Sequence, residues 1–222
     1  MYFKYGEKEI SYLKAKDARL GAVIDTIGHI YRHVDTDLFT SVIHHIIGQQ
    51  ISSKAQKTIW QRLNTAYGEI TSAVICHATE KDLQSLGMTF RKASYILDFA
   101  VKVEQGEFEL TAVKNMSDAE AICALSKVKG IGAWTAEMIL LFCLERPNIL
   151  SYNDLAIIRG MRMVYHHRKI NRTMFEKYRR RLSPYCSVAS LYFWAVAGGA
   201  IPGMKDYTPK KDKIAEKTND KK

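Results

Sequence analysis

The stretch VKGIGAWTA, residues 128–136, has the residue types of an anion-binding turn. Gly130 and Gly132 separate two helical patterns, ALSKV before them and AWTAEMILLF after them. Glycine permits positive φ and lets a ligand touch the main chain, and N–H groups beside the start of a helix attract phosphate. Such a turn would bind DNA by charge and shape, without reading base sequence. The simpler interpretation is an ordinary connection between two helices, because G-x-G alone is weak evidence.

The charge of the chain is consistent with a polyanionic partner. Its 222 residues include 33 Lys plus Arg and 23 Asp plus Glu, a formal net charge of +10. Proteins this basic often bind nucleic acid, although a basic protein without such a partner is the alternative. No apolar run reaches the roughly 18 residues that span a bilayer, and the N-terminus MYFKYGEKEI has no signal-peptide pattern. We therefore expect a cytoplasmic protein with no membrane partner.

The cysteine and histidine residues do not have metal-site spacing. Cys76, Cys123, Cys143 and Cys186 are scattered and form no C-x-x-C pair. This spacing argues against a zinc site, a disulfide framework and a clustered iron–sulfur loop. We expect the four thiols to be reduced and mostly buried. The adjacent histidines at 44–45 have too few companions to hold a metal, so no metal site is expected.

A hydrophobic period of 3.6 residues dominates the chain and predicts an all-α fold. Three apolar stripes are clear: Leu20, Val23, Ile24 and Ile27; Leu38, Val42, Ile43, Ile46 and Ile47; and Phe90, Ala93, Ile96, Leu97 and Val101. Capping boxes are expected at Thr79 with Asp82, at Ser117 with Glu120 and at Thr173 with Glu176, and helix stops at Gly68 and Gly106. No convincing strand is present, although the first dozen residues could pair weakly. We expect a compact bundle of about ten helices in one domain, residues 1–201.

The character of the chain changes at Pro202. Residues 202–222, PGMKDYTPKKDKIAEKTNDKK, are rich in lysine and poor in large apolar side chains. Such a segment buries too little to offset the entropy of ordering it, so we expect a mobile basic tail. The tail either adds non-specific attraction to phosphates or only increases solubility.

Five ordered segments resemble a known family. Residues 125–136, LSKVKGIGAWTA, resemble the helix-hairpin-helix of the DNA glycosylase superfamily, and SYND at 151–154 supplies the aspartate that this superfamily carries beyond its hairpin. Three further segments resemble the alkylation-repair branch, typified by bacterial 3-methyladenine DNA glycosylase II: 46–55 (IIGQQISSKA), 86–93 (LGMTFRKA) and 184–194 (PYCSVASLYFW). The resemblance implies an active site between two helical lobes.

The resemblance implies that Asp154 is the catalytic carboxylate. Cleavage of an N-glycosidic bond makes the sugar oxocarbenium-like, so the site needs a negative charge near the anomeric carbon and a water. The alternative is that Asp154 only caps the helix expected at 155–164, and Asn153 could cap it instead. Family members that also cut the strand use a lysine where this chain has Trp134, and an indole cannot form a Schiff base. The resemblance therefore implies a monofunctional enzyme that leaves an abasic site.

The resemblance also implies residues that contact DNA. A base must leave the stack before it reaches the site, and a wedge must fill the gap. The matching residues are Gln50, with its neighbours Gln49 and Ile51, for the wedge; Trp134, Trp194, Met138 and, as a replacement aromatic, Tyr152 for the base pocket; and Lys129, Gly130, Ile131, Gly132 and Thr135 for the hairpin that binds phosphate. Aromatic faces favour the cationic ring of an alkylated purine. The type member has an aromatic residue where this chain has Met138, and an apolar residue where this chain has Gln50. The alternative interpretation of Trp194 and Ile51 is that both pack in the hydrophobic core.

The function that the sequence favours is a monofunctional DNA glycosylase of base excision repair. It would act as a monomer on double-stranded DNA that contains alkylated purines of the 3-methyladenine or 7-methylguanine type. Through DNA binding it would associate with the nucleoid. The alternatives are another damaged base on the same scaffold, such as hypoxanthine or an oxidised purine, and a non-catalytic helix-hairpin-helix module. An iron–sulfur endonuclease of the same fold is not favoured, because this chain lacks the cysteines and the lysine that such an enzyme uses. No cofactor is expected, beyond a monovalent cation on the backbone carbonyls of residues 127–132.

Overall fold

Thirteen α-helices form the framework of residues 1–208, the part of the chain that this computed structural model describes. They are α1 (Glu7–Lys16), α2 (Ala18–Ile27), α3 (Leu38–Gly48), α4 (Ser53–Tyr67), α5 (Ser72–Ile75), α6 (Glu80–Ser85), α7 (Phe90–Glu104), α8 (Leu110–Asn115), α9 (Asp118–Leu125), α10 (Ala133–Phe142), α11 (Leu155–Tyr165), α12 (Arg172–Leu182) and α13 (Cys186–Ala197). Within these residues the only β-structure is an isolated antiparallel bridge between Tyr2 and His33. The all-α prediction is confirmed, and the weak pairing expected near the N-terminus amounts to this bridge.

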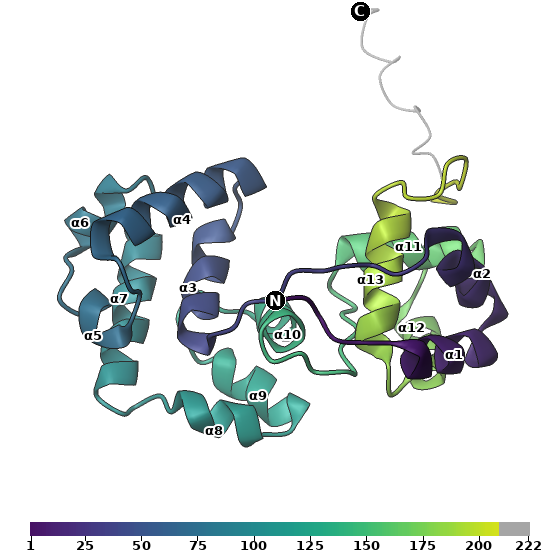
Figure 1. Ribbon diagram of the computed structural model, residues 1–222, viewed down its shortest axis with the longest axis horizontal. Helices are drawn as coiled ribbons and strands as arrows, with labels where there is room; N and C mark the ends of the chain where they lie inside the picture. The colour runs from purple at the N-terminus through teal and green to yellow at the C-terminus, as the bar shows by residue number, and fades with distance from the viewer. Residues whose placement is uncertain (209–222) are drawn as a thin grey trace, which may run out of the picture.

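The helices form two groups with α10 between them (Figure 1). One group holds α3 to α9, and the other holds α1, α2 and α11 to α13. α10 packs against α3 and α9, while α11 and α13 pack against each other and against α2. Buried apolar side chains from both groups form one cluster. The two lobes expected from the sequence are therefore present.

The number of helices exceeds the expected ten because several are very short. α5, α6 and α8 have 4, 6 and 6 residues. A segment of fewer than two turns is too short to show a period of 3.6 residues, so hydrophobic periodicity cannot separate it from a connection.

The apolar stripes predict the buried helix faces with one error. All five stripe residues of α3 are buried. In α7, however, Phe90 and Val101 are 52% and 36% exposed, and the buried face contains Phe99 and Ala100 instead. The prediction is wrong there because the buried face of α7 runs through Ala93, Ile96, Phe99 and Ala100, and Val101 lies beside that face.

Two of the three expected capping boxes are confirmed. Thr79 with Asp82 and Ser117 with Glu120 cap α6 and α9, and Gly68 and Gly106 have positive φ where α4 and α7 end. The third box is wrong, because α12 begins two residues earlier than expected. Its cap is Asn171, whose side chain accepts a hydrogen bond from the Met174 N–H at 2.9 Å. Thr173 therefore lies inside the helix.

Gly160 brings α11 and α13 close together. A Cβ placed on Gly160 would lie 2.2 Å from the carbonyl oxygen of Phe193 in α13. A side chain of any size would therefore push the two helices apart. α11 begins directly after Asp154, and α13 carries Trp194. The contact at Gly160 thus fixes the relative position of two candidate site residues.

Asp206 and Tyr207, near the start of the expected tail, contact α11 and its C-cap residue. Arg162 in α11 donates hydrogen bonds to Asp206 from Nε at 2.9 Å and from Nη2 at 2.7 Å, which holds the pKa of that carboxyl far below its usual range. The ring of Tyr207 lies 4.8 Å from that of His166. These contacts hold the segment on α11. The rest of the expected tail, residues 209–222, lies outside the described residues.

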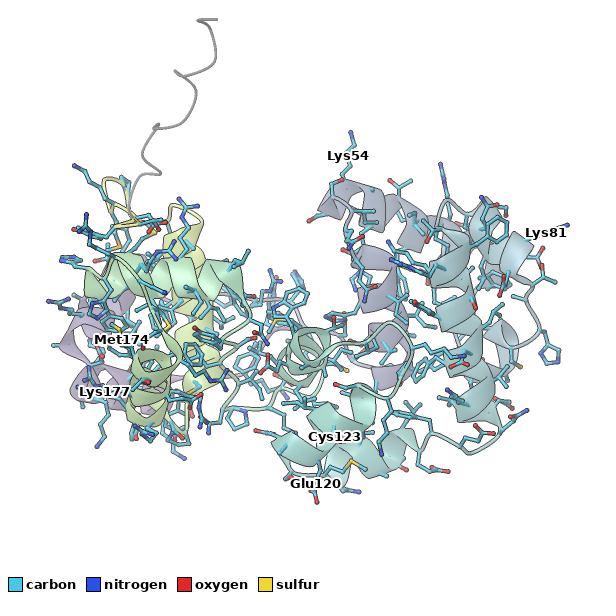
Figure 2. The ribbon with its side chains drawn as sticks, turned by 180° about the vertical axis from the view of Figure 1, so that it is seen from behind. Lys54, Lys81, Glu120, Cys123, Met174 and Lys177 are labelled. Atoms are coloured by element: carbon cyan, nitrogen blue, oxygen red, sulfur yellow. The ribbon has the colours of Figure 1, made fainter. Side chains whose placement is uncertain are left out.

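The cysteines are more exposed than expected. All four are free, but only Cys186 is buried. Cys123 lies on the exposed surface of α9 (Figure 2), and the other two are half-buried. The prediction of mostly buried thiols was therefore wrong.

Candidate active site

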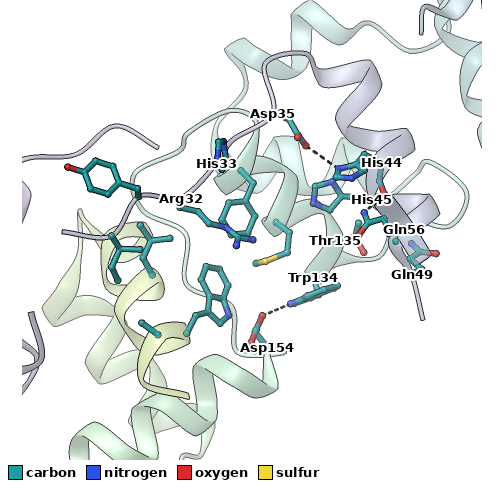
Figure 3. Close-up of a pocket in the computed structure, with 18 of the residues that line it drawn as sticks. Arg32, His33, Asp35, His44, His45, Gln49, Gln56, Trp134, Thr135 and Asp154 are labelled. Atoms are coloured by element: carbon teal, nitrogen blue, oxygen red, sulfur yellow. Dashed lines mark hydrogen bonds and ion pairs between the residues drawn. The ribbon is translucent and has the colours of Figure 1, made fainter. Parts of the chain in front are cut away.

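A cleft of about 850 Å³ lies between the two groups of helices (Figure 3). Its walls come from segment 30–35, from residues 44–50 at the end of α3, from α10 and from α13, and Asp154 lies among them. One wall is aromatic and the other is mostly polar. The cleft brings together residues that are far apart in the sequence, as expected for an active site between two lobes.

Asp154 caps α11 and faces the cleft. Its Oδ1 atom accepts hydrogen bonds from the backbone N–H groups of Ala156 and Ile157, both at 2.9 Å. Its Oδ2 atom accepts one from the indole N–H of Trp134 at 3.0 Å. The residue is 7% exposed, and the start of a helix favours the negative charge of a carboxylate. Capping therefore aims the second oxygen into the cleft, and Asn153, the other expected cap, does not cap α11.

The loop before Asp154 is held by Glu137. The Ser151 hydroxyl donates a hydrogen bond to the Glu137 carboxylate. The Asp154 N–H in turn lies 3.4 Å from the Ser151 carbonyl oxygen. Burial raises the pKa of Glu137, and the nearby charge of Asp154 adds to this effect. Glu137 therefore braces the loop that carries the candidate catalytic group.

Three of the four expected pocket residues line the cleft. Trp194 is half-buried, and its ring stacks on that of Phe142 with centroids 5.4 Å apart. Trp134 is 42% exposed, and Met138 is buried beside it in α10. Trp194 thus packs on the core and also borders the cleft, so its two interpretations are compatible. The resulting wall suits a flat ring.

Tyr152, the fourth expected pocket residue, lies elsewhere. Its ring packs edge-on against Phe175 at 5.1 Å, and the Arg172 guanidinium lies 5.0 Å from its centroid. These residues line a second cavity of about 300 Å³. Asp154 lines the cleft, whereas Tyr152 and Asn153, directly before it in the sequence, line this second cavity.

The polar wall of the cleft contains Asp35 and two histidines. The Ser41 hydroxyl donates to Asp35 at 2.7 Å, and His44 Nδ1 lies 3.9 Å from the same carboxylate. Burial opposes ionisation of Asp35, but these two partners outweigh it and lower the pKa of the carboxyl. His45 is half-buried beside them, burial lowers the pKa of its imidazole, and its Nδ1 lies 2.8 Å from the Ser41 carbonyl oxygen.

Arg32 also projects into the cleft, from the segment between α2 and α3 (Figure 3). Its guanidinium lies 4.6 Å from the centroid of the Phe142 ring. Burial lowers the pKa of Arg32, and the charge of Asp35 opposes this shift. Sequence reasoning missed Arg32, because a single basic residue in a connecting segment has no distinguishing pattern.

The hairpin has the geometry that its glycines predict. Gly130 has a φ of +85°, and a Cβ there would lie 2.4 Å from the Tyr95 ring. Gly132 precedes α10 with a φ of −90°, and a Cβ there would meet nothing within 4 Å. Ile131, between the two glycines, is buried. The first glycine is therefore required by the fold, while the second leaves bare main chain facing open space.

Lys129 and Thr135, the other expected hairpin residues, lie in different surroundings. Lys129 pairs with Asp98 at 2.6 Å, and the same carboxylate also pairs with Lys102. The two lysines therefore share one carboxylate, and a net positive charge remains beside the hairpin. Thr135 is buried and lines the cleft, because it lies on the inner face of α10 rather than on the surface of the turn.

Gln49 ties the expected wedge segment to the hairpin. Its side-chain amide donates a hydrogen bond to the Gly130 carbonyl oxygen at 2.6 Å. Lys92 in α7 also holds this segment, since its Nζ donates hydrogen bonds to the Ile47 and Gln49 carbonyl oxygens at 2.8 and 2.7 Å. Gln49 thus has a structural partner, and Lys92 is a positioning residue that sequence reasoning did not single out.

Gln50 and Ile51 are the exposed members of the wedge segment. Gln50 has a φ of +55°, which is unusual for a residue with a side chain, and it lines the cleft. Ile51 is 37% exposed, so its alternative as a core residue was wrong. The strained backbone at Gln50 projects these two side chains from the protein surface.

Residues 1–208 contain neither a metal-binding cluster nor a membrane-spanning helix. No three His, Cys, Asp or Glu side chains there gather in a way that could hold a metal ion. None of the helices in this part of the chain is long and apolar enough to cross a membrane. Of the carbonyls expected to bind a monovalent cation, those of Val128 and Gly130 already accept hydrogen bonds from Ile131 and Gln49.

Comparison with known proteins identifies the family. Residues 43–184 match the model of the HhH-GPD superfamily of base excision DNA repair proteins, and the chain belongs to this superfamily. A putative DNA-3-methyladenine glycosylase of Bacillus subtilis, YfjP, is 28% identical over 170 residues, which cover 72% of this chain and 59% of that protein. The chain therefore spans less than two thirds of the length of this relative.

Two solved structures share the fold over nearly their whole length. The DNA-3-methyladenine glycosidase of Bacillus halodurans has a TM-score of 0.80 and 29% identity, covering 89% of this chain and 93% of that one. The 3-methyladenine DNA glycosylase Mag1 of Schizosaccharomyces pombe, in complex with abasic DNA, has a TM-score of 0.76 and 25% identity, covering 91% and 100%. The fold predicted from the sequence is confirmed.

Proposed function

We propose that this chain is a monofunctional DNA glycosylase that releases alkylated purines of the 3-methyladenine and 7-methylguanine type from double-stranded DNA. The observation that carries the proposal is the position of Asp154, with one carboxylate oxygen fixed by α11 and the other facing an aromatic cleft. The names of the relatives support it, and so does the abasic DNA bound to Mag1, since such a reaction leaves an abasic site. The enzyme would act as a monomer on the nucleoid in the cytoplasm.

The proposed chemistry begins when the damaged nucleotide leaves the DNA stack and enters the cleft. The base lies against Trp194 and Trp134, where the ring faces attract its positive charge. The C1′–N bond then breaks, and the electron pair leaves with the base. Asp154 stabilises the positive charge on the sugar and accepts a proton from the water that attacks C1′. A unit charge at about 4 Å and an effective dielectric of about 20 contributes roughly 4 kcal/mol, or about three orders of magnitude in rate.

The enzyme would not cut the DNA strand itself. Strand cleavage in this fold uses an amine that attacks C1′, and Trp134 has no nucleophilic amine. The indole N–H instead donates to Asp154 and orients its carboxylate. No organic cofactor enters the proposal, and a monovalent cation would bind only at the backbone of residues 127–132.

Base release from methylated duplex DNA tests the proposed function. Free 3-methyladenine or 7-methylguanine, separated by chromatography, is the expected product, and the strand should break only after treatment with hot alkali. Breaks without alkali would contradict a monofunctional enzyme. DNA binding with no release of any damaged base would favour the non-catalytic module instead.

Gly132→Ala is expected to weaken DNA binding without weakening the fold. The new methyl group meets nothing in the free protein, so its effect must arise where the phosphate approaches the turn. We expect about a tenfold loss of affinity that is similar for all DNA sequences. Fluorescence anisotropy with several duplexes measures the affinity, and thermal unfolding checks the fold.

Gly130→Ala serves as the contrasting variant. Here the added methyl group strains a left-handed residue and overlaps Tyr95, so both stability and affinity should fall. If Gly132→Ala binds DNA as tightly as the wild type, the hairpin does not hold a phosphate at its second glycine.

Gln50→Gly is expected to slow base release most for lesions in well-paired duplexes. Glycine accepts the left-handed backbone at this position, so the change removes the side chain without adding strain. A wedge fills the space of the flipped nucleotide, and a mismatched lesion needs it less. We expect about a tenfold loss on the paired lesion, measured by single-turnover kinetics. Ile51→Ala, one residue further along, is the control, and a larger loss there would make Ile51 the wedge.

A further inference from the structure

Arg32 places a positive charge in the cleft without a partner of its own. Within residues 1–208, its guanidinium makes no hydrogen bond and no ion pair, and its contact is with the face of Phe142 at 4.6 Å. The backbone is fixed, because the Phe3 N–H donates to the Arg32 carbonyl oxygen at 2.8 Å. Figure 3 shows the guanidinium pointing from segment 30–35 toward the centre of the cleft. The N–H donors of the Arg32 guanidinium are therefore available to a base that enters the cleft.

The aromatic wall is already occupied by this cation. The Phe142 ring stacks on Trp194 with centroids 5.4 Å apart, and it also carries the Arg32 guanidinium. A cationic base that approaches this part of the cleft meets a like charge instead of a free aromatic face. Asp35 is the acidic side chain of the same segment, but it is engaged with Ser41 and His44. The attraction of the cleft for a cationic base is therefore reduced on the side of Arg32.

We infer that Arg32 is a specificity-determining residue, which extends release beyond the cationic alkylated purines of the proposed function to neutral purines that present hydrogen-bond acceptors. The planar fork of arginine matches the O6 and N7 acceptors of a 6-oxopurine such as hypoxanthine. Methylation at N7 removes one of these acceptors and adds a charge. The inference rests on the proposed function, since it concerns the base that the same cleft would release.

The bound guanidinium would also assist the departure of a neutral base. When the C1′–N9 bond breaks, its electron pair stays on the base, which then carries negative charge. Two hydrogen bonds from Arg32 to O6 and N7 stabilise that charge. Water supplies the hydroxyl that bonds to C1′, and its proton passes through Asp154 to the base. No oxidant, reductant or further reactant is needed.

Arg32→Met tests the inference, because methionine keeps an apolar chain over Phe142 and removes the charge. Single-turnover release is measured from two duplexes that differ only in the lesion, hypoxanthine or 7-methylguanine. We expect hypoxanthine release to fall about 10- to 100-fold, while 7-methylguanine release stays the same or rises. Arg32→Lys keeps the charge and loses the fork, so it should lose hypoxanthine release without gaining 7-methylguanine release. Arg172→Met is the matched control, since this arginine also lies over a ring, that of Tyr152 outside the cleft.

Three outcomes would separate this inference from the proposed function. If Arg32→Met releases both bases in the wild-type ratio, Arg32 does not determine specificity. If both fall equally and the salt dependence of binding becomes shallower, Arg32 contacts a phosphate, and the inference is again overturned. If the wild type releases neither base, the proposed function fails. Arg32 is then tested by anisotropy with the Asp154→Asn protein, in which adding Arg32→Met should weaken binding of the hypoxanthine duplex relative to the 7-methylguanine duplex.

Discussion

Asp154→Asn should slow the release of alkylated purines by roughly 10²–10³-fold, a loss of about 3–4 kcal/mol of transition-state stabilisation. The amide oxygen of asparagine can still accept the hydrogen bonds from Ala156 and Ile157, so α11 keeps its cap. The amide nitrogen then replaces the charged oxygen and faces the indole N–H of Trp134, which is also a donor. The substitution removes the negative charge while the helix stays in place.

The control for this prediction is Asp37→Asn, the same substitution at another helix cap. Asp37 caps α3 and accepts a hydrogen bond from the Thr40 N–H at 2.8 Å, but it does not line the cleft. Both variants should bind duplex DNA and unfold at about the wild-type temperature. Only the variant at 154 should lose base release in single-turnover assays. Retained activity in Asp154→Asn would assign the catalytic role to another group.

The sequence predicts the parts of the site whose geometry is set by neighbouring residues. The hairpin is one contiguous stretch, and a positive φ at Gly130, a buried Ile131 and a helix start at Ala133 all follow from local chemistry. The role of Asp154 is also predictable from local sequence, because a carboxylate directly before an apolar helix is expected to cap that helix. The direction of its second oxygen then follows from the cap geometry.

The parts that could not be predicted depend on contacts between distant segments. Lys92 supports the wedge segment 43 positions away, and Gln49 reaches the hairpin 81 positions away. No local pattern specifies these pairs, since α3 must first pack against α7 for the Lys92 contact and beside the turn between α9 and α10 for the Gln49 contact. The side chains of Arg32 and Tyr152 illustrate the same limit. The path of a connecting segment decides whether a residue enters the cleft or turns away from it, and hydrophobic periodicity says nothing about that path.

Gly160→Ala should destabilise the protein by about 2–3 kcal/mol, although alanine is the better helix former. The added carbon would lie 2.2 Å from the Phe193 carbonyl oxygen, which belongs to helix backbone and cannot rotate away. α11 and α13 must therefore separate, and buried apolar contacts between them are lost. For a chain of this length, we expect the unfolding temperature to fall by about 5–10 °C. Thermal unfolding followed by circular dichroism measures the change.

The matched control is Gly21→Ala, a helical glycine whose added Cβ would lie 3.3 Å from the Lys14 Cα in α1. A shift of a few tenths of an ångström relieves that contact, so its stability should change by less than about 1 kcal/mol. If both variants unfold together near the wild-type temperature, the close approach of α11 and α13 is not needed for stability. If Gly160→Ala stays folded at 25 °C, its base release should still fall. The separation of the two helices moves Asp154 relative to Trp194, and catalysis depends on small changes in the distance between the carboxylate and the bound base.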